Sequence, residues 1–173
     1  LVDFSVMDLH LLDAEPTEAE RAAVDRLLGP PGSSWEGGLR VVEVDGRLAQ
    51  GGHESRGRRH MLLPSLHAVR DRVGWITPGA LNYVCNRLSV PPADAYGVAT
   101  FYALFSLEPR PARVIHVCDD IACRTKGAAE LVEELEHRFG PEDTTNGDGA
   151  ATWLRSPCLG QCDRAPAALL ADA

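Results

Sequence analysis

The chain has 173 residues, of which 45% are apolar and 24% charged, a composition typical of a folded globular protein rather than a disordered one. No run approaches the roughly 18 consecutive apolar residues of a membrane-spanning helix, and the first residues lack the basic start of a signal peptide. The formal net charge is −8, and no basic stretch is interleaved with aromatic residues, which argues against a nucleic-acid partner.

Residues 16–105 are predicted to be mostly helical. The first helix is expected in PTEAERAAVDRLLG (16–29), where Thr17 and Glu20 have the spacing of a capping box and Gly29 provides a stop. The loop that follows is rich in Gly, Pro and Ser, and GLRVVEVDGR (38–47) inside it is compatible with a short strand and an Asp45-Gly46 turn. The positive run SRGRRH (55–60) is interpreted as a solvated loop or a helix entry.

Three further helices are predicted from capping signals and apolar periodicity. RHMLLPSLHAVRDRVG (59–74) places Leu62, Leu66, Val69 and Val73 on one face. ITPGALNYVCNRL (76–88) has an N-cap threonine followed by proline at the first helical position, and VPPADAYGVATFYALF (90–105) repeats the proline signal. The expected structure over residues 1–108 is a bundle of about four helices with an irregular region near its start.

The second half of the chain changes to the pattern of an α/β unit, expected over residues 109–173. Strands are predicted at ARVIHVC (112–118), ATWLRSP (151–157) and AALLADA (167–173), and PEDTTNGDGA (141–150) is a surface loop. TKGAAELVEELEHRFG (125–140) is an amphipathic helix that Gly140 ends. Loops after the carboxyl ends of strands are where such folds place ligands.

Five cysteines are present, and four of them form two pairs after predicted strands. Cys118 and Cys123 have four residues between them, and Cys158 and Cys162 have three, whereas Cys85 lies in a helical pattern and is interpreted as a small buried hydrophobe. An odd number of cysteines without a secretory signal favours a reducing compartment, expected to be the cytoplasm. Clustered thiols there bind metal more often than they form disulfides.

The spacing of the two pairs leaves several kinds of site open. Zinc is possible, although its ligand pairs commonly have two residues between the cysteines. Disulfide exchange usually uses C-x-x-C, which is absent, and a Rieske centre needs two histidines, whereas only His116 is near. A [2Fe–2S] cluster needs two thiolates per iron, and free N–H groups of the helix after Cys123 are expected to point toward its sulfurs. Spacing alone favours [2Fe–2S] over zinc, with structural or redox thiols as a third alternative.

Three motifs in order carry a family resemblance. YGVATFYALFSLEPR (96–110), VCDDIACRTKGA (117–128) and CLGQCDRAP (158–166) resemble the thioredoxin-like [2Fe–2S] ferredoxin family over about residues 60–170. Its members include the E subunit of bacterial respiratory complex I and equivalent subunits of NAD-reducing hydrogenases and NAD-dependent formate dehydrogenases. The resemblance implies an N-terminal helical bundle followed by a thioredoxin-like [2Fe–2S] domain.

The resemblance also implies the ligands of the cluster. One iron would be bound by Cys118 and Cys123, and the other by Cys158 and Cys162. Gly160 would allow a tight turn within the second pair. Pro166 follows the ligand loop, where thioredoxin-like folds often need a constrained turn, so a cis Ala165-Pro166 bond is an alternative to the more usual trans isomer.

The function implied by the resemblance is single-electron transfer within a multisubunit NAD(H)-linked oxidoreductase. This chain would carry the cluster without an independent catalytic site, and the sequence contains neither G-x-G-x-x-G nor a P-loop. FMN and NAD(H) would therefore bind a partner flavoprotein, and further iron–sulfur or catalytic subunits would complete the complex. This chain would not insert into a membrane. If the complex is membrane-bound, the chain would lie on its cytoplasmic side.

The same resemblance suggests how the chain docks and continues. The helical half would be the docking surface, with Phe101, Tyr102 and Phe105 as its anchor, although core packing is the commoner fate of most such rings. Relatives continue with a further strand and helix, so a truncated end or a fusion to the flavoprotein is expected after residue 173.

Overall fold

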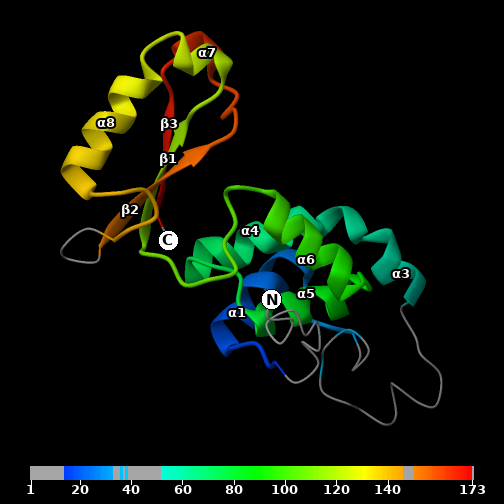
Figure 1. The fold of residues 1–173 in the computed structure, drawn as a ribbon. Helices are drawn as coiled ribbons and strands as arrows, with labels where there is room; N and C mark the ends of the chain where they lie inside the picture. The colour runs from blue at the N-terminus through cyan, green and yellow to red at the C-terminus, as the bar shows by residue number, and fades with distance from the viewer. Residues whose placement is uncertain (1–13, 33–35, 37, 39–51, 146–149, 173) are drawn as a thin grey trace, which may run out of the picture. The chain divides into compact units, whose positions relative to one another are not determined.

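The computed structural model describes residues 14–32, 36, 38, 52–145 and 150–172. The chain divides into two compact units, Leu1–Glu108 and Pro109–Ala173, and Figure 1 shows the first as helical and the second as a small sheet with helices. The strand predicted around residues 39–47, with its Asp45-Gly46 turn, lies outside the described residues.

The first helix, α1 (Glu18–Leu28), begins at the predicted capping box and ends at Gly29. The Thr17 hydroxyl accepts a hydrogen bond from the Glu20 amide at 3.3 Å, and the Glu20 carboxylate accepts one from the Thr17 amide at 2.6 Å. Glu20 also accepts a hydrogen bond from the Thr77 hydroxyl at 2.6 Å. Because Thr77 is the N-cap of another helix, the capping box also ties two helix starts together.

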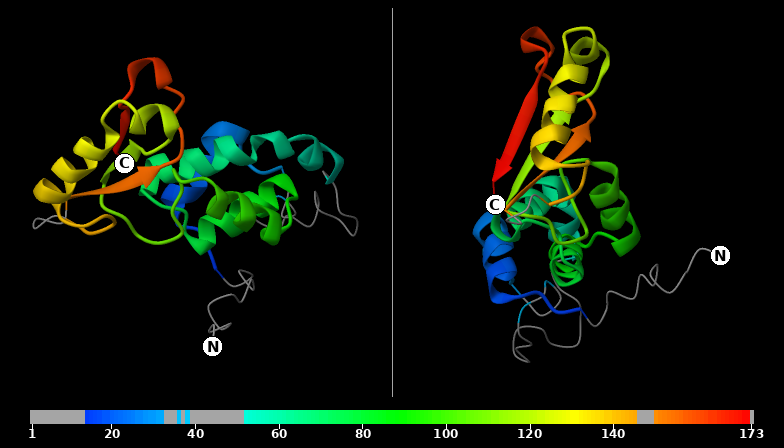
Figure 2. Two further views of the ribbon diagram at one scale, coloured as in Figure 1. Left: turned by 45° about the horizontal axis from the view of Figure 1, so that its top comes forward. Right: turned by 60° about the vertical axis from the view of Figure 1, so that its left-hand side comes forward.

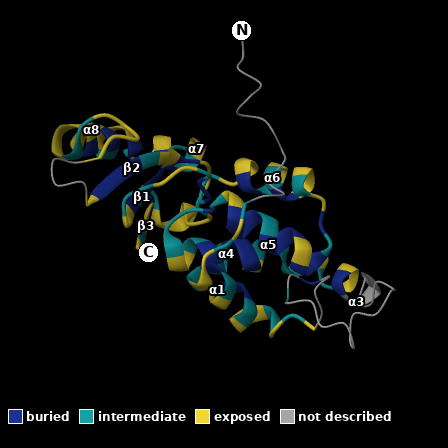
Figure 3. Cartoon of the chain, turned by 90° about the horizontal axis from the view of Figure 1, so that it is seen from below, coloured by how far each residue is buried: buried dark blue, intermediate teal, exposed yellow. Residues whose placement is uncertain are grey.

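The remaining helices of this unit pack around one apolar core. They are α3 (Gly52–Gly57), η4 (Arg59–Met61), α4 (Leu62–Val73), α5 (Pro78–Leu88) and α6 (Pro92–Phe101). In Figure 3, α5 is largely buried, since eight of its side chains, including Cys85, lie in the interior. The prediction of a helical bundle and of a buried Cys85 is therefore confirmed.

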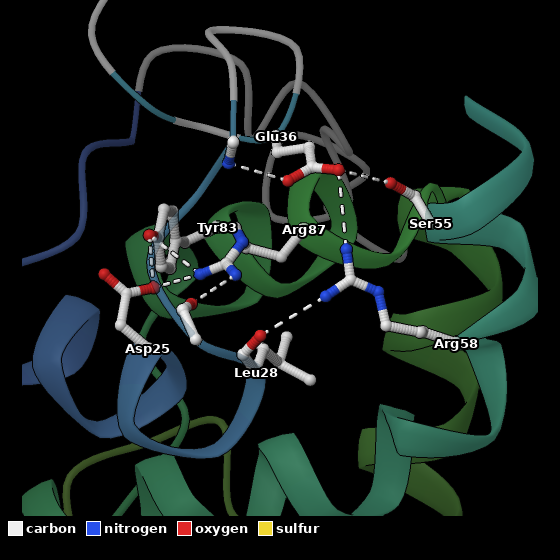
Figure 4. A network of polar contacts seen from close by, with 9 residues as sticks. Asp25, Leu28, Glu36, Ser55, Arg58, Tyr83 and Arg87 are labelled. Carbon is white, nitrogen blue, oxygen red and sulfur yellow. Dashed lines mark hydrogen bonds and ion pairs between the residues drawn. The ribbon is translucent and has the colours of Figure 1, made fainter. Parts of the chain in front are cut away.

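A polar network joins α1 to α5 across the bundle (Figure 4). Arg87 is completely buried and forms an ion pair with Asp25, and its Nη2 donates to the Gly29 carbonyl at 2.6 Å. The Tyr83 hydroxyl donates to the same Asp25 carboxylate at 2.7 Å. These bonds also satisfy a carbonyl at the C-terminal end of α1, which has no partner within its own helix.

The positive run at 55–60 is built into this unit rather than simply solvated. It forms the end of α3 and the start of η4, and Ser55 is buried. Arg58 donates to the Leu28 carbonyl at 3.3 Å and pairs with Glu36 at 3.4 Å (Figure 4). The interpretation as a solvated loop or a helix entry is confirmed in its second form: most of the run is exposed, and Arg58 also binds the end of α1.

The aromatic residues after α6 have different environments. The helix ends at Phe101, whose side chain is 79% exposed, and Tyr102 is 43% exposed. Phe105, beyond the helix, is buried in the core. The expectation that most of these rings pack in the core is therefore wrong for Phe101 and Tyr102, and the predicted docking role is excluded for Phe105.

The second unit is a three-stranded sheet with α8 (Ala128–Phe139) along one face, as Figure 2 shows. The strands are β1 (Arg113–Cys118), β2 (Ala151–Ser156) and β3 (Ala168–Asp172), in the order β2-β1-β3. β1 pairs with β2 in parallel and with β3 antiparallel. Val132 and Leu135 of α8 pack on Val117 and Trp153, which anchors the helix to the sheet.

Two short helical turns lie together at the end of this sheet where β1 and β2 finish. They are α7 (Ile121–Arg124) and η5 (Cys162–Arg164), near the top of Figure 1. Because the parallel strands end at the same edge, the loops that contain the two cysteine pairs start side by side. Within the described residues, none of the helices has the length and apolar character needed to cross a membrane.

Candidate metal centre

The first cysteine pair is placed by the end of β1 and by α7. Cys118 is the last residue of the strand, and Cys123 lies within the short helix. Asp120 is the N-cap of α7, since its carboxylate accepts a hydrogen bond from the Ile121 amide at 2.7 Å. Cys118 and Cys123 are both almost completely buried. The side chain of Ile121, in the same turn, is 78% exposed.

The second pair lies on the loop after β2 and on η5. The Cys158 and Cys162 sulfurs are 3.5 Å apart, and both residues are exposed. Gly160 has a φ of +74°, a value that favours glycine, and its amide lies 3.4 Å from the Cys158 sulfur. The turn expected at Gly160 is therefore present, and the Ala165-Pro166 bond is cis, the alternative to the more usual trans isomer.

Backbone contacts bring the two loops together. Ala167, which follows the second pair, lies in the same buried cluster as Cys118 and Cys123. The Cys118 amide in turn donates to the Ala167 carbonyl at 3.0 Å. Leu159 packs against the small apolar cluster that contains both thiols of the first pair. All four predicted site residues thus gather at one end of the sheet.

The amides between Cys123 and the long helix are used within the turn itself. The amides of Arg124, Thr125 and Lys126 donate to the carbonyls of Asp120, Ile121 and Cys123, so they are not available to a cofactor. The long helix begins only at Ala128, after the left-handed Gly127. The first free amides of that helix are those of Ala128–Glu130, and Ala128 packs in one cluster with Cys118 and Cys123, so the expected role of these amides stays a prediction.

The thiols differ in how readily they lose a proton. Burial raises the pKa of Cys118, but hydrogen bonds from the backbone of Asp120 and Leu159 and from Cys123 outweigh it, so the net pKa is lowered. Burial is the main cause that raises the pKa of Cys123. The pKa of Cys162 is raised chiefly by its hydrogen bond with Cys158. In the first pair the thiolate of Cys118 is therefore favoured over that of Cys123, and a bound cation would favour both.

The two thiol pairs can be compared with the needs of a binuclear cofactor. Within the part of the chain that the structure describes, no three Cys, His, Asp or Glu side chains gather so as to hold one metal ion. Two thiol pairs, with the Gly160 amide directed at one of the sulfurs, match the needs of a cluster with two thiolates per iron. His116 is buried in β1, two residues before Cys118.

An ion-pair network beside the thiols was missed by the sequence reasoning. Asp119 follows the first ligand candidate and accepts hydrogen bonds from Arg124 and Arg155. These two bonds are the causes that lower the pKa of the Asp119 carboxyl group. The opposite charges of Asp119 and Arg124, immediately after Cys118 and Cys123, are a signal for such a pair in the sequence. Arg155 comes from β2, so its part in the network can be seen only in the fold.

Comparison with known sequences connects this geometry to a family. The profile of the family described as thioredoxin-like [2Fe-2S] ferredoxin matches residues 49–173. The E subunit of NADH-quinone oxidoreductase from Pseudomonas aeruginosa is 34% identical over 121 residues, which cover 69% of this chain and 73% of that protein. The protein of the same name from Mycobacterium bovis is 29% identical over 160 residues, covering 92% of this chain and 62% of its own length.

Solved structures give the same fold. A crystal structure of an NAD+-reducing [NiFe]-hydrogenase in the air-oxidized state superposes with a TM-score of 0.51 and 28% identity. The match covers 64% of this chain and 19% of the hydrogenase chain, so the likeness concerns about a fifth of that chain. The H2-reduced state gives a TM-score of 0.52.

Proposed function

We propose, from the premise that this chain belongs to the thioredoxin-like [2Fe–2S] ferredoxin family, that it is the electron-transfer subunit of a multisubunit NAD(H)-linked oxidoreductase. The observation that supports this most directly is the meeting of two cysteine pairs at one end of the sheet. Relatives named as the E subunit of NADH-quinone oxidoreductase and the match to an NAD+-reducing hydrogenase support the class of complex.

In this proposal the four cysteines are the ligands of the cluster. Cys118 and Cys123 bind one iron, and Cys158 and Cys162 bind the other. A bound [2Fe–2S] cluster accepts and releases one electron at a time. The Gly160 amide donates a hydrogen bond to the Cys158 sulfur, and a donor at this place stabilises added negative charge on the sulfurs.

The two sides of the site have different tasks. The first pair is buried among Leu159, Ala128 and Ala167, which keeps water away from that side. The second pair is exposed, so an electron donor or acceptor can approach it closely. This chain then has no independent catalytic site; it positions a carrier, and the chemistry on substrate occurs on another subunit.

The partner in this proposal is a flavoprotein that binds FMN and NAD(H), with further iron–sulfur or catalytic subunits beside it. The flavin takes a hydride from NADH and passes on single electrons. Phe101 and Tyr102 form an exposed edge-to-face pair and are the proposed docking anchor of the helical unit. The complex lies in the cytoplasm or on the cytoplasmic side of a membrane.

The test is low-temperature EPR of the purified full chain after reduction with dithionite, together with iron and sulfide analysis. A rhombic S = 1/2 signal with about two irons and two sulfides per chain is the expected result. A colourless, EPR-silent protein that contains one zinc per chain would overturn the proposal, because zinc has no redox chemistry.

The ligand assignment has a matched pair of variants. Cys158→Ser is expected to remove the visible absorption and EPR signal of the cluster, whereas Cys85→Ser changes a thiol in the helical core and leaves both intact. A Cys158→Ser protein with the wild-type visible spectrum would exclude this residue as a ligand.

A further inference from the structure

Asp119 connects the segments that contain the two cysteine pairs. Its Oδ1 accepts a hydrogen bond from Arg124 Nε at 2.9 Å, and its Oδ2 accepts from Arg124 Nη2 at 3.2 Å and from Arg155 Nη1 at 3.1 Å. A carboxylate held by both arms of one guanidinium and by a second guanidinium has little freedom to rotate.

Asp119, Arg124 and Arg155 form a bridge of ion pairs, and each of them lies next to or shortly before a cysteine of the site. Asp119 follows Cys118, Arg124 follows Cys123, and Arg155 lies in β2, shortly before Cys158. The Asp119 amide also donates to the Ser156 carbonyl at 3.1 Å. The bridge therefore fixes the distance between the ends of β1 and β2 and the orientation of α7, which together determine where the two pairs of thiols meet.

The geometry distinguishes this bridge from an ordinary surface ion pair. Isolated exposed pairs contribute little, since solvent screens them and the side chains lose entropy. Here the Asp119 side chain is only 20% exposed, and Arg155 extends the network to Glu142, whose carboxylate accepts from Nε at 3.4 Å and from the Arg155 amide at 2.7 Å. Arg155 is thus held by a second carboxylate, so it loses less entropy when the bridge forms.

We propose that Asp119 is a positioning residue of the cluster site, which acts by holding the two ligand-bearing segments in register through Arg124 and Arg155. This inference depends on the proposed function, because it concerns the cofactor assigned there. The bridge also sets the charge beside that cofactor, since it places one carboxylate between two guanidinium groups.

The test uses the purified full chain and two single variants, Asp119→Asn and Arg155→Gln. Both break the link between β2 and the first cysteine loop, so both are expected to release iron to a chelator about 10-fold faster than the wild type. Their charge effects differ in sign. Loss of a negative charge favours the reduced state and raises the midpoint potential, whereas loss of a positive charge lowers it.

Glu134→Gln is the matched control. It removes a carboxylate that pairs with Arg138 on the exposed side of α8, away from the cysteine loops, and is expected to keep the wild-type iron release and potential. Far-UV circular dichroism of each variant reports whether the fold is retained. If folded Asp119→Asn releases iron at the wild-type rate, or if the two potentials shift in the same direction, the inference is wrong. A wild-type protein without a [2Fe–2S] cluster would instead refute the proposed function.

Discussion

Two glycines in neighbouring helices have opposite surroundings. A Cβ on Gly79, at the start of α5, would lie 2.3 Å from the Glu15 carbonyl oxygen, whereas one on Gly97, inside α6, would meet nothing within 4 Å. We expect Gly79→Ala to destabilise the protein by about 2 kcal/mol, since backbone must move. Gly97→Ala should stabilise it by about 0.5–1 kcal/mol, because alanine loses less backbone entropy in a helix. Urea unfolding of both variants measures the difference, and equal effects would contradict the close approach at Gly79.

Cys85 makes stability depend on pH at the alkaline end. Burial raises the pKa of its thiol from 9.0 to about 12. The folded state therefore favours the neutral thiol, so this contribution is complete below pH 9 and is lost as the pH rises toward 12. We expect the free energy of unfolding of the wild type to fall more steeply between pH 9 and 12 than that of Cys85→Ala. Parallel slopes in urea titrations at several pH values would show that Cys85 has no such role.

At the scale of whole elements, the packing of α1 on α5 is supported by the ion pair between Asp25 and the buried Arg87. Asp25→Ala leaves the completely buried Arg87 with only the Gly29 carbonyl and the Tyr83 hydroxyl as partners. We expect a loss of about 3 kcal/mol in the free energy of unfolding. Glu15→Ala removes an exposed pair with Arg21 and should cost at most about 1 kcal/mol. Denaturant unfolding compares the two; a small loss for Asp25→Ala would mean that Arg87 reaches solvent without it.

The elements that were predicted correctly have signals within their own sequence. The capping box at Thr17, the Thr77-Pro78 start of α5 and the Gly140 stop of α8 act over a few residues, so the sequence alone suffices. The short α7 has four residues and no room for an apolar period, and it was not predicted. The role of Arg58 also depends on a distant partner, the end of α1, which no local pattern reveals.

In the candidate site, too, features set by neighbouring residues could be predicted, whereas contacts between residues far apart in the chain could not. Spacing and resemblance identify the four cysteines, and the fold brings the two loops together. The packing around the first pair could not be predicted, because Leu159 and Ala167 lie in one cluster with thiols about 40 residues earlier in the chain. Asp119 was missed for the same reason, since its partner Arg155 comes from a neighbouring strand.

For the whole molecule, the two units have separate apolar cores, one built from α1 and α4–α6 and the other from the sheet and α8. Only the second unit contains the cysteine pairs, so a cluster that binds its folded state should stabilise that unit alone. We expect calorimetry of the holoprotein to show two transitions, and removal of iron with a chelator to lower the temperature of one of them.

Trp153 identifies which transition belongs to the sheet unit, because its side chain is completely buried against α8. Trp153→Phe should lower the midpoint of the transition that responds to the chelator and leave the other within about 1 °C, since the two cores share no residues. A single transition that moves as a whole on iron removal would mean that the helical and sheet units unfold cooperatively, and that the cluster stabilises both.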